Sequence, residues 1–409
     1  MTASPNIDTG AAQKGQRPEL RLRPNKTPQR LRRGFPWAYD NELVLDRRTR
    51  KLAPGTVVDL LDADRGFIAV AALNPSSKIA ARVIDTDRGA AVGRDWFLAR
   101  LRAALAFRKR VFCTPYYRLV HAEADGLPGL IVDRFGDTLA VQPNSAWAEA
   151  YWSDLMDALK ALLAPSAVVK NTSGRARGLE GLPDDGGVAF GAVPSLIPVP
   201  MNGATYMADL ISGQKTGLFF DQRDNQAFVA GLARGGSMLD VFSHVGGFGL
   251  AALAAGANSA LCVDSSAKAL DLARKGAVAT GHGARLTTRQ GDGFDTMAAL
   301  AADDARFDAV VCDPPAFAPA KSALQAGLRA YERVARLGAM LVAPGGYLTL
   351  CSCSHAAGLD AFRDVSLRGI SKAGRQGALI RTGFAGVDHP VHPALAETAY
   401  LKSITLRLF

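Results

Sequence analysis

The chain has 409 residues, which is too long for one ordinary hydrophobic core, so we expect three domains. Hydrophobic residues make up 48% and charged residues 21%, a balance that excludes a disordered or fibrous chain. The sequence contains no run of roughly 18 uncharged apolar residues, so we expect no membrane-spanning helix. A formal net charge of +10 favours a polyanion as the partner.

Residues 1–20 lack the apolar core of a secretory signal, and they are predicted to be a disordered tail of a cytoplasmic protein. The five cysteines are scattered along the chain, and no pair has the CxxC spacing of a zinc site. These patterns predict no disulfide framework and no bound metal. Any special cysteine is therefore expected to be a reactive thiol.

Residues 21–88 are predicted to form a small β-rich domain, with strands at TVVDLLDA, FIAVAAL and IAARVID. Residues 21–51 contain ten basic side chains and three acidic ones, a net charge of +7 for this segment. Concentrated positive charge suits a polyanion, and a solvated basic face is the equal alternative. Arg30, Arg32 and Arg33 are the candidate RNA-contacting residues.

Residues 89–200 are predicted to form a small central α+β domain. Residues 96–112 have helical periodicity with Arg and Lys on the outer face, and this helix is expected to link the first two domains. Strand-like runs follow at GLIVDRFGDTLAVQ and SAVVKNT, separated by one helical stretch, WAEAYWSDLMDALKALL.

Residues 201–409 show a regular alternation of short apolar strands and helical segments. The strands are SMLDVF, ALCVD, FDAVVCD and YLTLCSC, and the helices include residues 266–279 and 323–342. Such alternation predicts an α/β fold with a doubly wound, Rossmann-like sheet.

Acidic residues follow successive strands of this region at the expected carboxyl edge of the sheet. Asp240 lies at the end of the first strand, although it could equally be a helix cap. Asp264 ends the next strand, where a carboxylate can accept both ribose hydroxyls of an adenosyl group. Asp292 follows the third strand, within reach of an adenine amino group.

Glycines stand where the first strand of this domain turns into a helix. Gly246 and Gly247 would let the backbone approach a ligand closely, and a packing turn is the alternative for glycines taken alone. Together with the three acids they predict S-adenosylmethionine as the cofactor, because the third glycine of the dinucleotide fingerprint is missing. The full set of predicted cofactor contacts is Asp240, Phe242, Gly246, Gly247, Asp264, Asp292 and Asp313.

The fourth strand ends in Asp313-Pro314-Pro315, which places a carboxylate and a stiff extended loop beside the expected cofactor methyl group. The prolines and Phe317 are candidate substrate contacts. Phe317 offers an aromatic face on which a base can stack, and a core position is the alternative.

In the next strand, Cys351 and Cys353 alternate with serines, so both thiols are expected on one face. Inert core cysteines are the commoner case. Methylation of carbon 5 of a pyrimidine, however, requires a thiolate that adds to carbon 6, and Cys353 lies nearer the carboxyl edge. We therefore predict Cys353 as the catalytic nucleophile. Asp313 is predicted to bond the Watson–Crick edge of the cytosine and to assist protonation at N3.

These residues together resemble the large-subunit ribosomal RNA methyltransferase I family of bacterial 23S rRNA (cytosine-5)-methyltransferases. RGFPWAYDNE is similar to the start of that family's PUA domain, an RNA-binding barrel, and LVHAEADGLPGLIVDRFGD, preceded by Arg118, to its central domain. The catalytic-domain motifs occur in the family's order: KTGLFFDQRDN, DVFSHVGGFGLAAL, CDPPAF, LCSCSH and DHPVHPALAETAYLK. The resemblance implies a cofactor pocket of Asp240, Gly246, Asp264 and Asp292, with Cys353 as nucleophile.

The chain departs from the expected pattern at two places. Ala316 stands where most RNA cytosine-5 enzymes have a second cysteine that helps to release the product, so His355, Asp313 or water must serve as the base. His244-Val245-Gly246 replaces an expected Tyr-Thr-Gly, with little consequence for cofactor binding.

Two other functions compete with this one. A guanosine methyltransferase on rRNA would share the acids and the DPPxF loop but would need no thiol. A non-catalytic RNA-binding or ribosome-assembly factor would keep the fold as a scaffold. The expected partner is 23S ribosomal RNA, naked or at an early stage of assembly, and the sequence leaves open whether the chain forms a homodimer.

Overall fold

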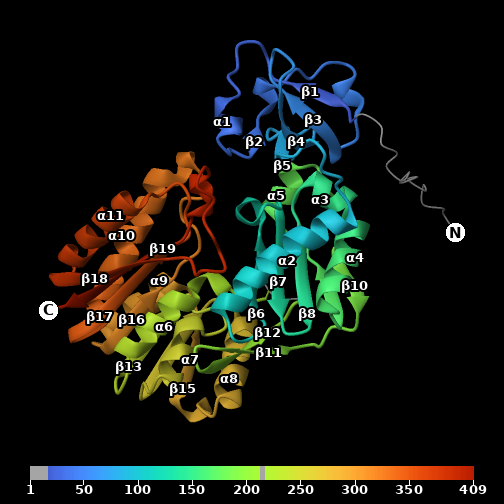
Figure 1. Cartoon of the computed structure of the whole chain (residues 1–409). Helices are drawn as coiled ribbons and strands as arrows, with labels where there is room; N and C mark the ends of the chain where they lie inside the picture. The colour runs from blue at the N-terminus through green and yellow to red at the C-terminus, as the bar shows by residue number, and fades with distance from the viewer. Residues whose placement is uncertain (1–16, 212–216) are drawn as a thin grey trace.

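The computed structural model describes residues 17–211 and 217–409, so most of the predicted tail lies outside the described residues. Three sheets of five, five and seven strands lie in the N-terminal, central and C-terminal domains (Figure 1). This arrangement agrees with the predicted fold class.

The N-terminal domain is a five-stranded sheet in the order β1-β3-β4-β5-β2. Alternating apolar residues of β3 and β4 bury Val58, Leu60 and Ala71 in a core that Leu31 of α1 completes. Residues 19–21 form β1, parallel to β3, so the predicted tail of residues 1–20 extends too far into the domain. The elements are β1 (Glu19–Arg21), α1 (Gln29–Arg32), β2 (Trp37–Ala38), β3 (Thr56–Leu61), β4 (Phe67–Leu73) and β5 (Ala81–Asp85).

The central domain is a sheet in the order β10-β9-β8-β7-β6, covered by α2 and α4. Phe97 of α2 stacks on Trp147, with ring centroids 5.4 Å apart, in the middle of its core. The single helix predicted after β8 is broken at Tyr151 into α3 and α4. The elements are α2 (Arg94–Val111), β6 (Tyr116–His121), β7 (Leu130–Phe135), β8 (Thr138–Pro143), α3 (Ala146–Ala150), α4 (Trp152–Leu163), β9 (Ala167–Lys170), α5 (Arg175–Leu179) and β10 (Gly187–Gly191).

A buried carboxylate joins the first two domains. Glu180 accepts hydrogen bonds from Asn74 Nδ2 and Arg82 Nη2, each at 2.9 Å. Arg82 and Trp37 Nε1 also bond Glu123 of the central domain, at 2.9 and 2.8 Å. Because these charges are removed from water, breaking one partner is costly, and the network fixes the orientation of the two domains.

A hairpin of β11 (Ile197–Met201) and β12 (Ala204–Ala208) opens the C-terminal domain. Val199 and Tyr206 pack with Leu250 and Leu272 of that domain. The boundary predicted after residue 200 cuts through β11 and is therefore wrong by a few residues, because the packing partners of the hairpin lie mainly downstream.

The C-terminal sheet has the order β15-β14-β13-β16-β17-β19-β18. The first five strands are parallel to their neighbours, and β19 pairs antiparallel with both β17 and β18. The elements are α6 (Arg223–Leu232), β13 (Ser237–Val241), α7 (Gly247–Ala254), β14 (Ser259–Asp264), α8 (Ala267–Ala279), β15 (Leu286–Gln290), α9 (Gly293–Ala302), β16 (Phe307–Cys312), α10 (Leu324–Leu341), β17 (Val342–Ser352), α11 (Leu359–Lys372), β18 (Gly377–Phe384) and β19 (Lys402–Leu408).

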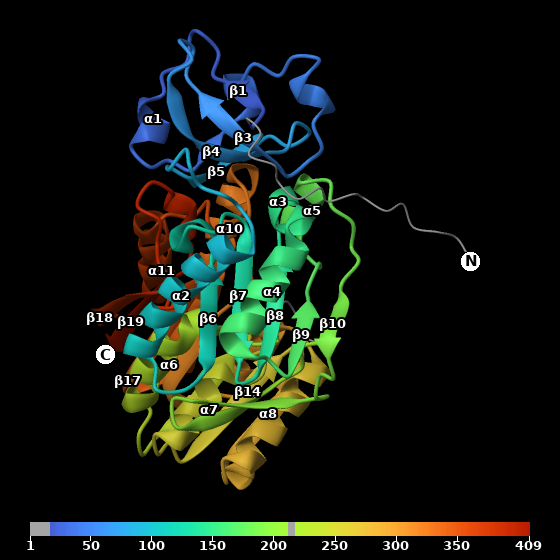
Figure 2. The same ribbon diagram turned by 45° about the vertical axis from the view of Figure 1, so that its right-hand side comes forward.

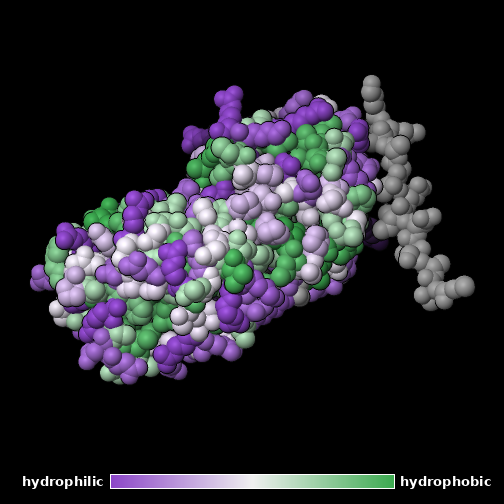
Figure 3. All heavy atoms as spheres, turned by 90° about the horizontal axis from the view of Figure 1, so that it is seen from below, coloured by the Kyte–Doolittle hydropathy of each residue, from purple (hydrophilic) through white to green (hydrophobic). Residues whose placement is uncertain are grey.

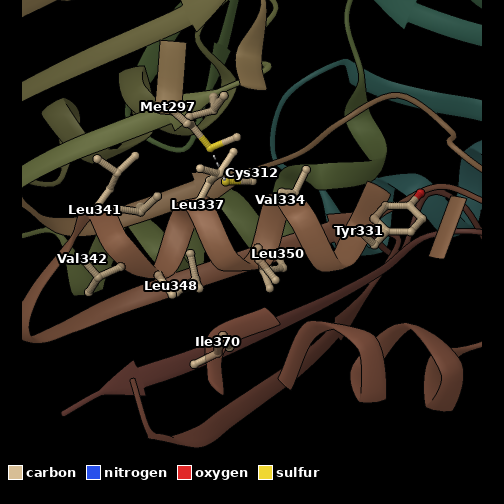
Figure 4. Close-up of a cluster of buried hydrophobic side chains, with 14 of the residues drawn as sticks. Met297, Cys312, Tyr331, Val334, Leu337, Leu341, Val342, Leu348, Leu350 and Ile370 are labelled. Atoms are coloured by element: carbon tan, nitrogen blue, oxygen red, sulfur yellow. Dashed lines mark hydrogen bonds between the residues drawn. The ribbon is translucent and has the colours of Figure 1, made fainter. Parts of the chain in front are cut away.

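Helix α10 packs lengthwise against this sheet. Val334, Leu337 and Leu341 lie above Leu348 and Leu350 of β17, and Met297 of α9 reaches Cys312 (Figure 4). These residues recur every three or four positions along α10, which is why the sequence predicted a helix there. The buried core fixes the strand ends against one another.

The central domain also contacts the C-terminal domain directly, as the two views of the ribbon show (Figure 2). Arg108 Nη2 donates to the carbonyl oxygen of Asp388 at 3.0 Å, and the backbone N–H of Arg118 donates to Asp388 Oδ2 at 2.9 Å. The rings of His121 and His389 are 5.0 Å apart, and burial lowers the pKa of both, so both are neutral at pH 7.

Seen from below, hydrophilic and hydrophobic residues are interspersed over the surface (Figure 3). Within residues 17–211 and 217–409, no helix has the length and the apolar composition needed to cross a membrane.

Candidate functional site

The predicted acids and cysteines converge because the strands that carry them are parallel neighbours. Val241 pairs with Val263 of β14 and with Cys312 of β16, and Asp264 pairs with Gln290 of β15. Residues that follow these strands therefore share one edge of the sheet, which is where ligands bind in open α/β folds.

The turn from β13 into α7 has an unusual backbone. Phe242 has a φ of 62°, His244 of 50° and Gly246 of 80°. Two non-glycine residues in the left-handed region within three positions are strained, and such strain clusters at ligand-binding sites. The backbone N–H of His244 donates to Asp264 Oδ2 at 2.8 Å, which holds the turn against the next strand.

Asp240 lies beneath this turn and is completely buried. Its Oδ2 accepts from the backbone N–H groups of Phe248 and Gly249, at 3.1 and 2.9 Å, in the first turn of α7. Its Oδ1 is also buried and has no hydrogen-bond partner in the described part of the chain. Burial raises the pKa of Asp240 to about 7, and the two N–H groups oppose that rise.

Asp264 and Asp292 lie nearer the surface than Asp240. Asp264 is partly exposed, and its Oδ1 accepts from the backbone N–H of Ser266 at 2.8 Å. Asp292 is exposed and caps α9, accepting from the backbone N–H groups of Phe294 and Asp295 at 2.8 and 3.0 Å. Both carboxylates are thus held in place by main-chain donors while remaining accessible.

Close packing limits the space beside the turn. A Cβ added at Gly293 would lie 2.5 Å from the ring of Phe242, so only glycine fits there. A Cβ added at Gly247 would lie 2.7 Å from Nε2 of Gln226. The predicted cofactor residue Phe242 is therefore partly buried against the start of α9.

Asp313 follows β16, and the side chain of Gln222 reaches it. Gln222 Nε2 donates to Asp313 Oδ2 at 2.9 Å, and Gln222 Oε1 accepts from Asn225 Nδ2 at 2.8 Å. The carboxylate is therefore oriented by a chain of buried amides that starts in α6.

The two cysteines of the fifth strand have different surroundings. Cys351 is buried in the core beneath α6 and α7, and burial raises its pKa well above the ordinary range. Cys353 stands one residue beyond the end of β17 and is partly exposed.

The intervening serines bind Tyr331 of α10. Ser352 Oγ donates to the phenol oxygen at 2.9 Å, and Ser354 Oγ lies 2.7 Å from it. Ser354 Oγ also accepts from the backbone N–H of Ala318 at 2.8 Å. These bonds fix both sides of Cys353 and tie its segment to the loop after Asp313.

That loop places its residues at different depths. Pro314 is buried and Pro315 exposed. Phe317 is partly buried, with its ring centroid 5.0 Å from that of Tyr331 and 5.8 Å from that of Phe294. Phe317 therefore has contacts with the core as well as a partly open position.

The arginines predicted to contact RNA lie in the N-terminal domain, apart from the strand ends (Figure 1). Arg30 pairs with Glu42 at 2.8 Å and stacks over Phe35 at 3.9 Å. Arg32 pairs with Asp62 at 2.7 Å. Arg33 is exposed at the end of α1 and has no ion-pair partner in the described part of the chain.

Sequence reasoning missed three side chains of this site, which are Gln222, Tyr400 and Lys402. Tyr400 donates to Asp221 Oδ2 at 2.6 Å, and Lys402 Nζ donates to the carbonyl oxygen of Ser354 at 2.6 Å. All three lie in segments that resemble the family's motifs. The spacing of residues in those segments, however, did not indicate a chemical role for any of them.

The geometry fits an adenosyl cofactor. The strained turn directly follows the end of β13, and the carboxylates of Asp264 and Asp292, at or just after the ends of the next two strands, are accessible. Asp240 supports the same turn from below, through α7. No group of three or more His, Cys, Asp and Glu residues suited to a metal ion occurs among residues 17–211 and 217–409.

Comparisons with known proteins identify the domains. The profile of PUA-like domains matches residues 20–86, and that of S-adenosylmethionine-dependent methyltransferases matches residues 195–373. Two solved structures share the whole fold with a TM-score of 0.79 at 19% identity. One is a candidate SAM-dependent methyltransferase from Streptococcus mutans, and the match covers 95% of this chain and 100% of that protein. The other is a candidate methyltransferase complexed with SAH, and the match covers 96% of this chain and 100% of that protein.

Proteins that are similar in sequence match this chain over nearly its full length. "Ribosomal RNA large subunit methyltransferase I" of Erwinia tasmaniensis is 33% identical, covering 92% of this chain and 96% of its own. The Aeromonas hydrophila protein of that name is 34% identical with the same coverage, and a "Ribosomal RNA large subunit methyltransferase" of Deinococcus radiodurans is 32% identical over 96% and 98%. The chain therefore belongs to the S-adenosylmethionine-dependent ribosomal RNA large subunit methyltransferase I family.

Proposed function

We propose that this protein methylates carbon 5 of a cytidine in 23S ribosomal RNA through a covalent adduct between Cys353 and carbon 6. The observation that carries the proposal is the position of Cys353. It is partly exposed at the carboxyl end of β17, whereas Cys262, Cys312 and Cys351 are buried. A thiol at this edge is adjacent to the strand ends that fit the cofactor.

The chemistry requires such a thiol because carbon 5 of cytosine is a poor nucleophile. Addition of the Cys353 thiolate to carbon 6 shifts the electron pair of the carbon 5–carbon 6 bond to carbon 5. S-adenosylmethionine supplies the methyl group that carbon 5 takes up. Loss of the proton from carbon 5 restores the double bond, the carbon 6–sulfur bond breaks, and its electron pair returns to Cys353.

Asp313 is proposed to hold the base. Its carboxylate is oriented by Gln222. Asp313 directly follows Cys312, which pairs with Leu350, the residue before Cys351 in β17. From there it can accept a hydrogen bond from the Watson–Crick edge of an extruded cytosine and assist protonation at N3. Pro314, Pro315 and Phe317 would line the space for the flat base.

The base that removes the carbon 5 proton must differ from that of enzymes with a second cysteine, because this chain has Ala316 after the two prolines. His355 is exposed two residues beyond Cys353, and it joins Asp313 and water as a candidate.

The N-terminal domain is proposed to bind the RNA backbone, with Arg30, Arg32 and Arg33 on the contacting surface. Two of these arginines pair with acids, which keeps their guanidinium groups ordered but reduces their net charge. We expect the substrate to be 23S ribosomal RNA that is naked or at an early stage of assembly, and the reaction to take place in the cytoplasm.

The test is to trap the adduct with RNA that contains 5-fluorocytosine, because fluorine at carbon 5 cannot leave as a proton. We expect a stable protein–RNA complex whose cross-linked peptide contains Cys353. The Cys353→Ala variant should lose turnover and adduct while keeping its affinity for adenosylhomocysteine. Cys351→Ala is the matched control and should still form the adduct.

An adduct on Cys351 would overturn the assignment of the nucleophile. Full activity of Cys353→Ala without any adduct would instead support direct transfer to another base, such as a guanosine.

A further inference from the structure

Lys402, the first residue of β19, brings a charged side chain beside Cys353. It pairs across the sheet with Ser352, and its Nζ donates to the carbonyl oxygen of Ser354 at 2.6 Å. Its second acceptor is the carbonyl oxygen of Tyr400, at 3.1 Å. Because Ser352 and Ser354 are the two neighbours of Cys353, these contacts place the ammonium group alongside the thiol residue.

The burial of Lys402 is costly for the fold. The residue is only 4% exposed, and both of its hydrogen-bond acceptors are neutral main-chain oxygens. An ammonium removed from water is stabilised well only by a negative charge nearby. Burial lowers the pKa of Lys402, whereas its interaction with Cys353 raises it. A thiolate on Cys353 would supply the missing negative charge.

The two tyrosines near the thiol do not supply a positive charge. Tyr331 of α10 and Tyr400 both interact electrostatically with Cys353, and burial raises the pKa of each, so both are neutral at pH 7. Of these two and Lys402, only Lys402 can carry a positive charge. Other titratable residues on neighbouring elements include Asp221, which accepts a hydrogen bond from Tyr400, and Asp313, which accepts one from Gln222. Cys351 lies two residues earlier in the chain and His355 two residues later.

We infer that Lys402 is a positioning residue that holds Cys353 as a thiolate between Ser352 and Ser354, ready to add to carbon 6 of the substrate base. The inference rests on the proposed function, since it concerns the same thiol. The thiol proton is released to solvent, and Lys402 keeps its own proton throughout. The ammonium favours the thiolate again when the carbon 6–sulfur bond breaks, so it serves both addition and elimination.

The pH dependence of Cys353 alkylation by iodoacetamide tests this inference, because only the thiolate reacts. A Cys113→Ser background removes the exposed cysteine that would also react. In this protein the alkylation rate should reach half of its maximum below the ordinary thiol pKa of about 8.5. Lys402→Met should move that midpoint up by about one pH unit, which is about a tenfold lower rate at pH 7.

Two further variants separate charge from packing. Lys402→Arg keeps the positive charge and should restore most of the low midpoint. Lys170→Met removes a partly buried lysine of β9 that pairs with Glu149 and should leave the midpoint unchanged. Affinity for adenosylhomocysteine shows whether each variant is folded.

If the alkylation rate of the protein that keeps Lys402 reaches half of its maximum at the ordinary thiol pKa, the inference is wrong. This holds even if Lys402→Met does not fold. An equal midpoint in folded Lys402→Met would also overturn the inference. The measurement uses no RNA, so it is independent of adduct trapping. A low midpoint without any fluorocytosine adduct would contradict the proposed function alone.

Discussion

At the scale of single residues, acids that reach the same edge of the sheet differ in what they can contact. Asp264 is the last residue of β14 and is partly exposed, with main-chain donors holding both oxygens. Asp240 is one residue short of the end of β13 and is completely buried. We infer that Asp264 meets the ligand directly, whereas Asp240 acts by supporting α7.

We predict that Asp264→Ala weakens the binding of adenosylhomocysteine. The change removes two charge-assisted hydrogen bonds to the ribose hydroxyls, each worth about 1.5 to 3 kcal/mol, so affinity should fall by at least about a hundredfold. Titration calorimetry measures this loss. Asp271→Ala is the control, because Asp271 pairs with Lys275 on the exposed face of α8. Equal affinity in Asp264→Ala and the unaltered protein would contradict the pocket assignment.

We predict that Asp240 makes the free protein less stable as the pH rises from about 4 to 7. Its pKa is raised from 3.8 to about 7 by burial, so the folded state binds more protons than the unfolded state in this range. The stability that protonated Asp240 contributes below its ordinary pKa is then lost as the pH approaches the pKa of Asp240 in the folded protein. The loss amounts to a few kcal/mol, since each pH unit between the two pKa values is worth about 1.4 kcal/mol. Asp240→Asn should lack this slope.

Thermal unfolding of the unaltered protein and of Asp240→Asn at several pH values checks this prediction. The quantity compared is the difference in stability between the two proteins at each pH. Carboxylates such as Asp46 and Asp185, whose pKa values are lowered, contribute the opposite slope in both proteins and cancel. A difference that does not change between pH 4 and 7 would refute the raised pKa.

At the scale of elements, the turn from β13 to α7 and the end of β17 carry the site. The turn is held by Asp240 below and Asp264 beside it, and the end of β17 is held by Tyr331 and Lys402. Both segments are therefore rigid before any ligand binds, which limits the entropy that binding must overcome.

We predict opposite effects for two glycine-to-alanine substitutions in neighbouring elements. Gly246 has a φ of +80°, and an added Cβ would lie 3.1 Å from that of Ala273, so Gly246→Ala should destabilise the protein by about 1 to 2 kcal/mol. Gly231 lies within α6 with nothing within 4 Å of an added Cβ. Gly231→Ala should therefore stabilise by about 0.4 to 1 kcal/mol.

Melting temperatures give the sign of each effect, and calorimetry should show weaker adenosylhomocysteine binding only in Gly246→Ala. If Gly246→Ala binds the ligand as tightly as Gly231→Ala does, the strained turn is not part of the cofactor site.

At the scale of the whole molecule, buried polar contacts join all three domains. Glu180 ties the N-terminal domain to the central one, and burial opposes its ionisation, but Arg82 and Asn74 outweigh burial and lower its pKa. Asp388 ties the central domain to the catalytic one. An RNA bound by the N-terminal domain would therefore be held at a fixed position relative to Cys353.

We predict that Arg33→Gln flattens the salt dependence of RNA binding. Arg33 is exposed and lacks the acidic partners of Arg30 and Arg32, so it is the best placed of the three to neutralise a phosphate. Loss of one phosphate contact should reduce the slope of log affinity against log salt by about 0.7 to 0.9. Arg274→Gln on α8, at the opposite end of the molecule from α1, removes the same charge and should leave the slope unchanged (Figure 1). Equal slopes for the two variants would make the basic segment a solvated face.

The sequence by itself determined the three-domain α/β architecture, because apolar periodicity depends only on local spacing, as in α10 and β17. It also identified the acids at the strand ends, since parallel strands bring their carboxyl ends to one edge. Only the tertiary structure decided that Asp240 is buried and that Lys402, 49 residues after Cys353, lies beside it. Burial and cross-strand contacts depend on how segments that are distant in the sequence pack together. That packing cannot be predicted from composition or from the local spacing of residues.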